Sequence, residues 1–446
     1  MLGWSGVAHG MLSLPAEPEP AGWQGAHGGQ KGRAETMYQT LQGKARGLEA
    51  DLIRFAQEFV RTPSRTHAEQ QAADLMAAAM QELGYDRVVR DDAGNVLGIL
   101  FGRRPERTLL LAGHLDTAET ALGSAWAHEP WSGAIEGGRL HGVGASDCKG
   151  GLAAQIFAGA ILRRSLLPLD GTLVVAGTVA EECRGSAGVR HLVEHTLPAL
   201  GLRPTAAVLG EPTGLGLYYG HDGWAELEVR VEGWDPFQVG DAARSIRAQF
   251  DEGPGTAALA GGAGESLSVS EWEVDDEAET GLRRALIRVD HRFRDGVPAL
   301  MSRLQRQFGL ATQATGDVRV DVRVRQEVQS FYTGQLVQVD RVIDAWAIDP
   351  FHPLMERSRQ ALTAAGCAFR AGTWQLGRRG MGTAGGVLVQ QFAIPTIGYG
   401  PGEEAQAHAP NEHVALAAMT EAAYGTAAIA HGLIGVPVFG WTADEI

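Results

Sequence analysis

The hydrophobic positions in the first half of the chain follow two different periods. In some segments apolar side chains recur every three to four residues, the period of an amphipathic helix; these segments are 47–83, 149–165 and 185–200. Between them lie continuous apolar runs, typical of strands buried on both faces, at 94–102, 108–116, 171–182 and 205–212. Helices that alternate with buried strands predict an α/β domain with a mostly parallel sheet.

The pattern changes after Tyr219. Residues 223–233 alternate apolar and polar side chains, as a half-exposed antiparallel strand does. The segments that follow predict a helix, two strands, a helix and a strand, at 239–250, 266–274, 283–293, 297–308 and 318–325. This β-α-β-β-α-β series is the split arrangement of a small two-layer α+β domain.

Helix and strand patterns of the first kind return after about residue 339, in 353–366 and 394–400. The sequence therefore predicts one α/β catalytic domain that is interrupted by an inserted α+β domain. We place the two parts of the catalytic domain at 37–217 and 339–446, and the insertion at 218–338. Residues 1–36, rich in Gly, Pro, Ala and Glu, are predicted to form a disordered extension.

The composition of the 446-residue chain narrows the class of protein. Its net charge of −15 argues against non-specific binding to nucleic acid, which needs a basic surface. No apolar run reaches the roughly 18 residues of a membrane-spanning helix. The three cysteines, Cys148, Cys183 and Cys367, are too widely spaced for a disulfide scaffold, and this favours a reducing cytoplasm.

Six ionisable side chains lie where predicted strands or loops end. They are His114, Asp147, Glu181, Glu182, Glu211 and His408. The carboxyl ends of strands are where open α/β sheets bind their ligands. Four carboxylates with only two imidazoles and almost no lysine nearby would repel one another without a cation. The adjacent pair Glu181 and Glu182 therefore indicates a site for divalent metal.

His114 and Asp116, two residues apart, point to the same side of an extended chain. A metal-binding histidine usually donates its second ring N–H to a carboxylate, which fixes its tautomer. We interpret His114 as a ligand and Asp116 as its orienting partner. Taken alone, the pair also fits a surface histidine beside an aspartate, and Asp147 alone also fits a helix cap.

The order of H-x-D, Asp, Glu-Glu, Glu and a late His resembles the co-catalytic zinc aminoacylase and carboxypeptidase family. This family includes acetylornithine deacetylase, succinyl-diaminopimelate desuccinylase and glutamate carboxypeptidase-type enzymes. The resemblance covers nearly all of residues 45–435. The segments GASDCKGGLAA, GTVAEE, GEPT and IPTIGYGPGEEAQAH look closest to its selenium-metabolism-linked hydrolase branch.

The resemblance implies two Zn²⁺ ions per chain, with Co²⁺ or Mn²⁺ as possible substitutes. It implies that Asp147 bridges the ions and that the peptide bond from Asp147 to Cys148 is cis. The other implied ligands are His114 and Glu211 on one ion, and Glu182 and His408 on the other. Glu181 would then be no ligand but the general base, and Asp116 the second catalytic residue.

The inserted domain departs from the family's pattern. Relatives usually carry a lid histidine in a motif like G-x-x-x-H-x-S-x-P, which reaches the partner subunit's active site, followed by G-x-N-A. Here the segment VEGWDPFQVGDAARSI is shorter, lacks histidine and has Ala242 at the asparagine position. His221 or His291 would be substitutes, or would have plain structural roles. Arg292 resembles the lid arginine that holds a substrate carboxylate, and equally fits a strand-end salt bridge.

Together these observations predict a cytoplasmic, dinuclear zinc hydrolase of an N-acyl amino acid or small peptide with a free carboxylate. The resemblance implies a homodimer formed through the inserted domain, with no nucleic-acid or membrane partner. The candidate substrate-binding residues are Arg292, His221, Thr383 and Gly385. Two alternatives stay open: a metal-binding pseudoenzyme, because the lid histidine is missing, and an aminopeptidase-like exopeptidase on the same metal core.

Overall fold

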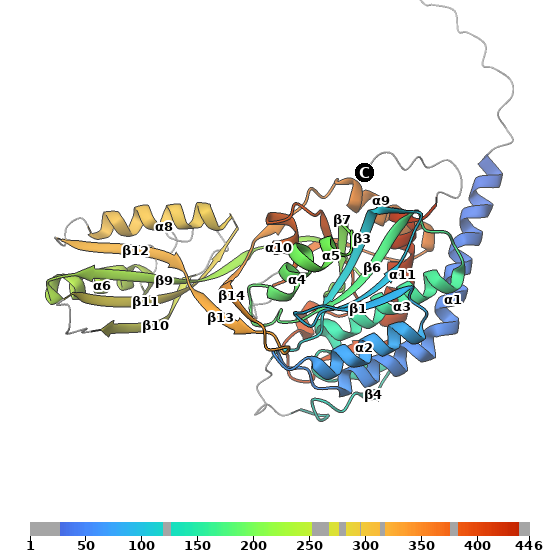
Figure 1. Cartoon of the computed structure of the whole chain (residues 1–446), viewed down its shortest axis with the longest axis horizontal. Coiled ribbons are helices and arrows are strands. Elements are labelled where there is room, and N and C mark those ends of the chain that lie inside the picture. The colour runs from blue at the N-terminus through green and yellow to red at the C-terminus, as the bar shows by residue number, and fades with distance from the viewer. Residues whose placement is uncertain are drawn as a thin grey trace, which may run out of the picture.

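The computed structural model describes residues 27–118, 126–251, 267–275, 282–294, 296–312, 317–374 and 382–436. They form a large lobe and a smaller, elongated one (Figure 1). The predicted extension at 1–36 lies largely outside the described residues. Its last part differs from the prediction, because helix α1 begins at His27 and runs to Arg61.

The large lobe is built on a nine-stranded sheet with the order β1-β2-β6-β3-β7-β18-β8-β16, in which β17 also pairs with β8. The strands are β1 (Arg87–Arg90), β2 (Val96–Leu100), β3 (Arg104–His114), β6 (Gly171–Thr178), β7 (Pro204–Leu209), β8 (Leu217–His221), β16 (Trp346–Ala347), β17 (Ala371–Trp374) and β18 (Thr396–Gly398). The central neighbours β6, β3, β7 and β18 are parallel, and both edges add antiparallel strands. The predicted α/β fold with a parallel sheet centre is confirmed.

Helices cover both faces of this sheet. One apolar core joins it to α1, α2 (Gln70–Glu82), α3 (Gly150–Ser165), α9 (Pro353–Ala365) and α11 (Leu416–Ile434). A second core lies on the other face, with α4 (Ala187–His191), η2 (Leu192–Thr196), α5 (Leu197–Ala199) and α10 (Gly385–Gln390). Strands between two cores are buried on both faces, which is why their sequences read as continuous apolar runs.

Helix α3 packs so closely on the sheet that one of its positions requires glycine. A Cβ atom on Gly151 would lie 1.6 Å from the carbonyl oxygen of Gly210. No side chain fits in that space, so any larger residue would push α3 away from the end of β7. The residue after Gly210 is Glu211, and the glycine contact therefore helps to fix its position.

The smaller lobe contains a sheet with the order β10-β11-β9-β12, to which β15 adds by pairing with β9. Its elements are β9 (Gly223–Gly233), α6 (Pro236–Asp251), β10 (Leu267–Asp275), β11 (Arg283–Phe293), α8 (Val297–Thr312), β12 (Val318–Val324) and β15 (Val342–Ile343). This is the expected β-α-β-β-α-β series. Helices α6 and α8 bury the apolar face of the sheet, including Leu227, Val229 and Ile287.

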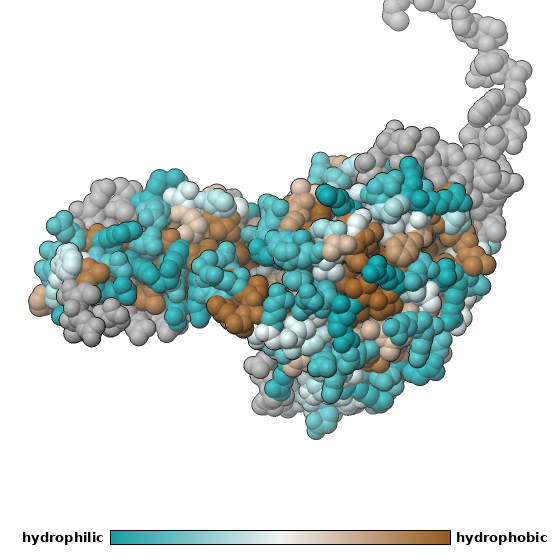
Figure 2. Space-filling view, viewed as in Figure 1, coloured by the Kyte–Doolittle hydropathy of each residue, from teal (hydrophilic) through white to brown (hydrophobic). Residues whose placement is uncertain are grey.

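The opposite face of the smaller sheet is charged. Glu228 of β9 lies opposite Arg288 of β11 and Arg323 of β12. Such cross-strand pairs of opposite charge stabilise a sheet face that helices do not cover. The visible surface of this lobe is mainly hydrophilic, and a hydrophobic patch lies where it meets the large lobe (Figure 2).

Short elements complete the described structure. They are the hairpin β13 (Gln326–Ser330) and β14 (Leu336–Asp340), the small sheet of β4 (Ala134–Glu136), β5 (Arg139–His141) and β19 (His413–Ala415), and the turns η1 (Ala145–Lys149) and η4 (Glu404–Gln406). Among the described residues, no helix combines the length and the apolar character that crossing a bilayer requires.

Candidate metal centre

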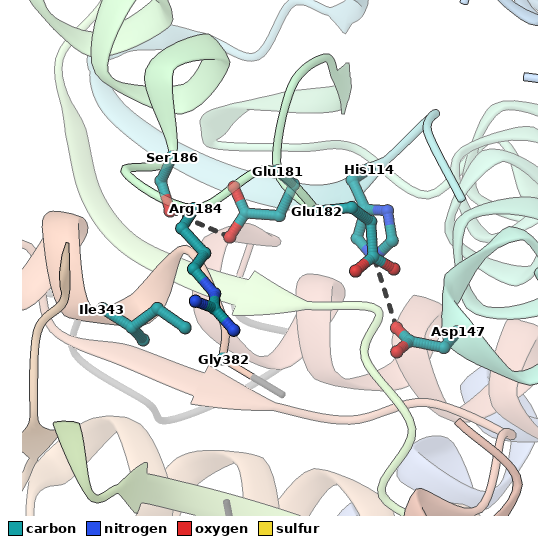
Figure 3. Close-up of a pocket in the computed structure, with 8 residues that line it drawn as sticks. All are labelled: His114, Asp147, Glu181, Glu182, Arg184, Ser186, Ile343 and Gly382. Carbon is teal, nitrogen blue, oxygen red and sulfur yellow. Dashed lines mark hydrogen bonds and ion pairs between the residues drawn. The ribbon is translucent and has the colours of Figure 1, made fainter. Parts of the chain in front are cut away.

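The ionisable residues singled out in the sequence meet at one edge of the large sheet. His114 ends β3, Glu182 follows β6, and Glu211 follows β7. These three strands are parallel neighbours, so their carboxyl ends lie side by side. Asp147 reaches the same place from η1 and His408 from the loop after η4. Figure 3 shows His114, Asp147, Glu181 and Glu182 around one pocket.

Three of these side chains form a first group of metal-ligating atoms. The Nε2 atom of His114 lies 3.2 Å from Oδ1 of Asp147 and 3.8 Å from Oε2 of Glu211. Cys148 is the fourth member of the group, within 4.8 Å of the others. Burial raises the pKa of the Cys148 thiol, which accepts the backbone N–H of His114. The thiol thus has a structural contact of its own.

A second group shares Asp147 with the first. The Nε2 atom of His408 lies 3.2 Å from Oδ2 of Asp147 and 3.0 Å from Oε2 of Glu182. Asp147 therefore offers one carboxylate oxygen to each histidine. A carboxylate between two donor groups is the arrangement expected for a ligand that bridges two ions. The peptide bond from Asp147 to Cys148 is cis, as the resemblance implied.

Asp116 lies at the centre of this edge, but its carboxylate contacts a different group from the one expected. The Nδ1 atom of His114 is 2.8 Å from the backbone carbonyl of Asp116 and 3.6 Å from its carboxylate. The carboxylate instead accepts the backbone N–H groups of Glu181 and Glu182, at 3.2 and 2.9 Å. Asp116 thus orients the histidine through its main chain and the two glutamates through its side chain.

The two adjacent glutamates leave the strand through a sharp turn at Ala180, whose φ is 54°. Beyond the turn their side chains separate. Glu182 turns toward His408, whereas Oε1 of Glu181 accepts the hydroxyl of Ser186 at 2.9 Å. The other oxygen of Glu181 is buried without a hydrogen-bond partner. The pair therefore presents one carboxylate to a ligand group and one beside it.

Burial of so many acids distorts their titration. Burial raises the pKa of Glu181 to about 7 and raises that of Glu211 well above its usual range. Burial alone would lower the pKa of His408, but Glu182 and Asp147 raise it to about 11. The Oε2 atom of Glu211 is also buried without a hydrogen-bond partner. This excess of buried negative charge fits a site for divalent cations.

Glu412 supports the site and was not singled out in the sequence. Its buried carboxylate accepts the backbone N–H groups of Ser146, Asp147 and Gly144, at 2.8, 2.9 and 3.0 Å. It thereby fixes the turn that carries Asp147. The only sequence signal is its place four residues after His408, in a loop already assigned to the site.

The four candidate substrate-binding residues lie away from this pocket or have partners within the protein. His221 is buried, and its Nε2 accepts the backbone N–H of Thr383 while Nδ1 contacts the carbonyl of Asp222. Arg292 pairs with Asp222 at 3.3 Å. Thr383 and Gly385 hold the start of α10. None of the four is among the residues that line the pocket, whereas Gly382, next to Thr383, is; their role in substrate binding stays a prediction.

The segment in which relatives carry the lid histidine is a two-residue connection. Strand β9 ends at Gly233 and α6 begins at Pro236. The Oδ1 atom of Asp235 accepts the backbone N–H of Phe237 at 2.8 Å. Ala242 is buried inside α6. The connection is thus a helix cap with no room for a loop that could present a histidine.

Comparison with known proteins identifies the family of the chain. The model of peptidase family M20/M25/M40 matches residues 110–431. The chain is a metal-dependent hydrolase of the peptidase and amidohydrolase class. It belongs to peptidase family M20/M25/M40.

Individual relatives match most of the chain or only part of it. The Escherichia coli protein YgeY is 26% identical over 393 residues, which cover 84% of this chain and 92% of that protein. A succinyl-diaminopimelate desuccinylase of Rhodospirillum centenum is 34% identical over 172 residues, 37% of this chain and 44% of the enzyme. The fold is similar to that of Bacillus subtilis YXEP, a dinuclear metal binding peptidase, with a TM-score of 0.63, 14% identity and coverage of 86% and 98% of the two chains.

Proposed function

We propose that the protein is a dinuclear zinc hydrolase that cleaves the amide bond of an N-acyl amino acid or small peptide. The observation that carries this proposal is the sharing of Asp147 between two donor groups, one with His114 and one with His408. Glu211 completes the first group and Glu182 the second. Nitrogen and carboxylate oxygen donors of this kind suit zinc.

When bound, the two ions would polarise the amide carbonyl and acidify a water between them. Glu181 lines the pocket and has one carboxylate oxygen held by Ser186 and one buried without a hydrogen-bond partner. Its carboxylate is turned toward Ser186 and Arg184 (Figure 3). We assign it as the general base, which takes a proton from the attacking water and delivers it to the leaving nitrogen. Asp116 keeps Glu181 and Glu182 in place through their backbone N–H groups.

The test combines metal content with turnover. We expect close to two zinc ions per chain by mass spectrometry, and hydrolysis of at least one of N-acetyl-L-leucine, N-acetyl-L-lysine and alanyl-leucine. Glu181→Gln should lower kcat by about 10²- to 10⁴-fold and keep the metal, because it removes a proton acceptor and no ligand. Glu194→Gln, at an exposed glutamate, is the control.

Four results would contradict the proposal. Protein that cannot be loaded with metal would exclude the metal centre, and an active Glu181→Gln variant would exclude the assigned base. Two bound ions without hydrolysis of any substrate would favour the metal-binding pseudoenzyme. A preference for substrates with a free amine over those with a free carboxylate would favour the aminopeptidase-like alternative.

A further inference from the structure

Arg184 lines the metal pocket and also a second cavity beside it. In the metal pocket its side chain lies near Ile343 and Gly382, across from Asp147 (Figure 3). The second cavity has a volume of about 520 Å³ and opens on the charged face of the smaller sheet. Its walls are Arg184, Trp224, Glu226, Arg288, Asp290, Arg325 and Arg341. Arg184 is the residue common to both spaces.

The other charged groups of this cavity are largely paired with each other. Glu226 accepts hydrogen bonds from Arg325 and, at 2.8 Å, from Arg341. Arg341 also contacts Glu327 at 3.0 Å, and Arg288 lies 3.9 Å from Glu228. These pairs fix the wall of the cavity and leave little free charge on its sheet side.

Arg184 differs from its neighbours because no carboxylate of the described residues lies within ion-pairing distance of it, although Asp290, Glu226 and Glu327 attract it at longer range. Among the described residues its guanidinium forms no ion pair and no hydrogen bond; it stacks on the ring of Trp224, with 3.5 Å between Cζ and the ring centroid. Stacking orients a guanidinium and leaves its in-plane N–H groups available. The backbone of Arg184 has a φ of 70°, within a turn whose Gly185 and Ser186 also have positive φ. A half-buried arginine held in this way is prepared for an anion.

The charged side chains that line the second cavity indicate which kind of ligand Arg184 can bind. Four guanidinium groups face two carboxylates, those of Glu226 and Asp290. Asp290 interacts electrostatically with Arg184, but the described residues show no direct ion pair between the two side chains. Glu228 and Glu327, just outside the lining, pair with Arg288 and Arg341, so the cavity as a whole carries no surplus of positive charge. The guanidinium of Arg184 has no ion pair among the described residues, and a planar carboxylate matches its paired N–H groups.

We infer that Arg184 binds a carboxylate of the substrate, while the scissile amide lies at the metal centre. This inference rests on the proposed function and assigns its carboxylate-binding residue to the turn after β6, in place of Arg292. The stack on Trp224 joins the turn to β9 of the smaller sheet. Carboxylate recognition therefore depends on both sheets, and Arg184 determines specificity without touching the reacting atoms.

The test compares an acid with its neutral analogue on the same enzyme. The probes are N-acetyl-L-leucine and N-acetyl-L-leucinamide, or the corresponding pair for whichever substrate is hydrolysed, and the readout is the ratio of their kcat/KM values. We expect the wild-type protein to prefer the acid, and Arg184→Gln to reduce the ratio about 10- to 100-fold. Arg184→Lys should keep part of the preference, because an ammonium retains the charge and loses the paired geometry. A ratio does not depend on the folded fraction of a variant.

Arg190→Gln, in the neighbouring helix α4, is the matched control and should keep the wild-type ratio. The inference is overturned if Arg184→Gln keeps the preference, or if Arg292→Gln removes it. Isothermal titration of the zinc-loaded protein with L-leucine and L-leucinamide adds a readout without turnover. Absence of hydrolysis in the wild-type protein would count against the proposed function, whereas selective binding of L-leucine that is lost in Arg184→Gln would still support the role of Arg184.

Discussion

At the scale of single residues, neighbours in the sequence have separate tasks because their contacts differ. Glu182 lies 3.0 Å from a histidine ring nitrogen, whereas Glu181 accepts a serine hydroxyl. The carboxylate of Asp116 accepts both backbone N–H groups, so the turn is held without using either glutamate side chain. The turn at Ala180, where φ is positive, lets the two glutamate side chains point to different groups.

Glu412 provides a prediction about positioning. A carboxylate accepts three backbone N–H groups here, and the amide of Glu412→Gln would place donors against donors. We expect zinc affinity to fall about 10- to 100-fold, as for other residues that orient metal ligands. Competition with a chromogenic chelator measures this affinity. Glu403→Gln, at an exposed site, is the control, and an unchanged affinity in Glu412→Gln would show that the turn holds its shape alone.

The residues of the metal centre were within reach of the sequence, because most follow strands whose apolar runs are easy to recognise. The structure brings His114, Asp147 and His408 together as expected. Glu412 and Arg184 were not within reach. The role of Glu412 depends on backbone groups that lie far away in the sequence, such as the N–H of Asp147, 265 residues distant. The role of Arg184 depends on its stacking on Trp224 and on the lack of a direct ion pair among the described residues. Neither property leaves a pattern in the chain.

At the scale of elements, the long helices and strands with a clear hydrophobic period were predicted from the sequence. Several short strands were not, because their sequences show no such period. The helical pattern predicted within 47–83 corresponds to two helices, α1 and α2, separated by a loop. The hairpin β13–β14 and the small sheet of β4, β5 and β19 were not predicted. Strands of three to five residues with mixed polarity form because a partner strand is available, and local sequence does not specify that partner.

Helix α11 allows a prediction about pH. Burial lowers the pKa of His431 to about 4, below the roughly 6.5 of an unfolded chain. The unfolded state therefore takes up a proton first as the pH falls, so stability is lost between about pH 6.5 and pH 4. By this linkage, the free energy of unfolding of His431→Leu should fall by about 2 kcal/mol less between pH 7 and pH 5 than that of the wild-type protein.

Urea unfolding of the metal-free protein at the two pH values measures this difference. His195→Gln, which removes an exposed histidine, is the control and should follow the wild-type protein. If His431→Leu shows the same loss of stability as the wild-type protein, His431 does not contribute to the acid sensitivity of the fold.

At the scale of the whole molecule, the metal centre connects distant parts of the chain. Its side chains extend from His114 to His408, and metal bound only by the folded state stabilises that state. At a free zinc concentration of about 100 times Kd, the gain is about 2.7 kcal/mol. The midpoint temperature of thermal unfolding should therefore rise when zinc is added and fall after treatment with a chelator. Asp147→Asn should lose most of the shift, because Asp147 belongs to both donor groups; a full shift in this variant would contradict the shared site.

The position of β18 in the large sheet has a consequence for biosynthesis. This strand, Thr396–Gly398, lies between β7 and β8, although nearly two hundred residues separate it from them in the sequence. While the ribosome is still making the preceding segments, β7 and β8 have no neighbour to join them, and each exposes an open edge. His408, which follows β18, emerges later still. The nascent chain must therefore collapse around an incomplete sheet, and the group of Asp147, Glu182 and His408 is complete only after His408 has been translated.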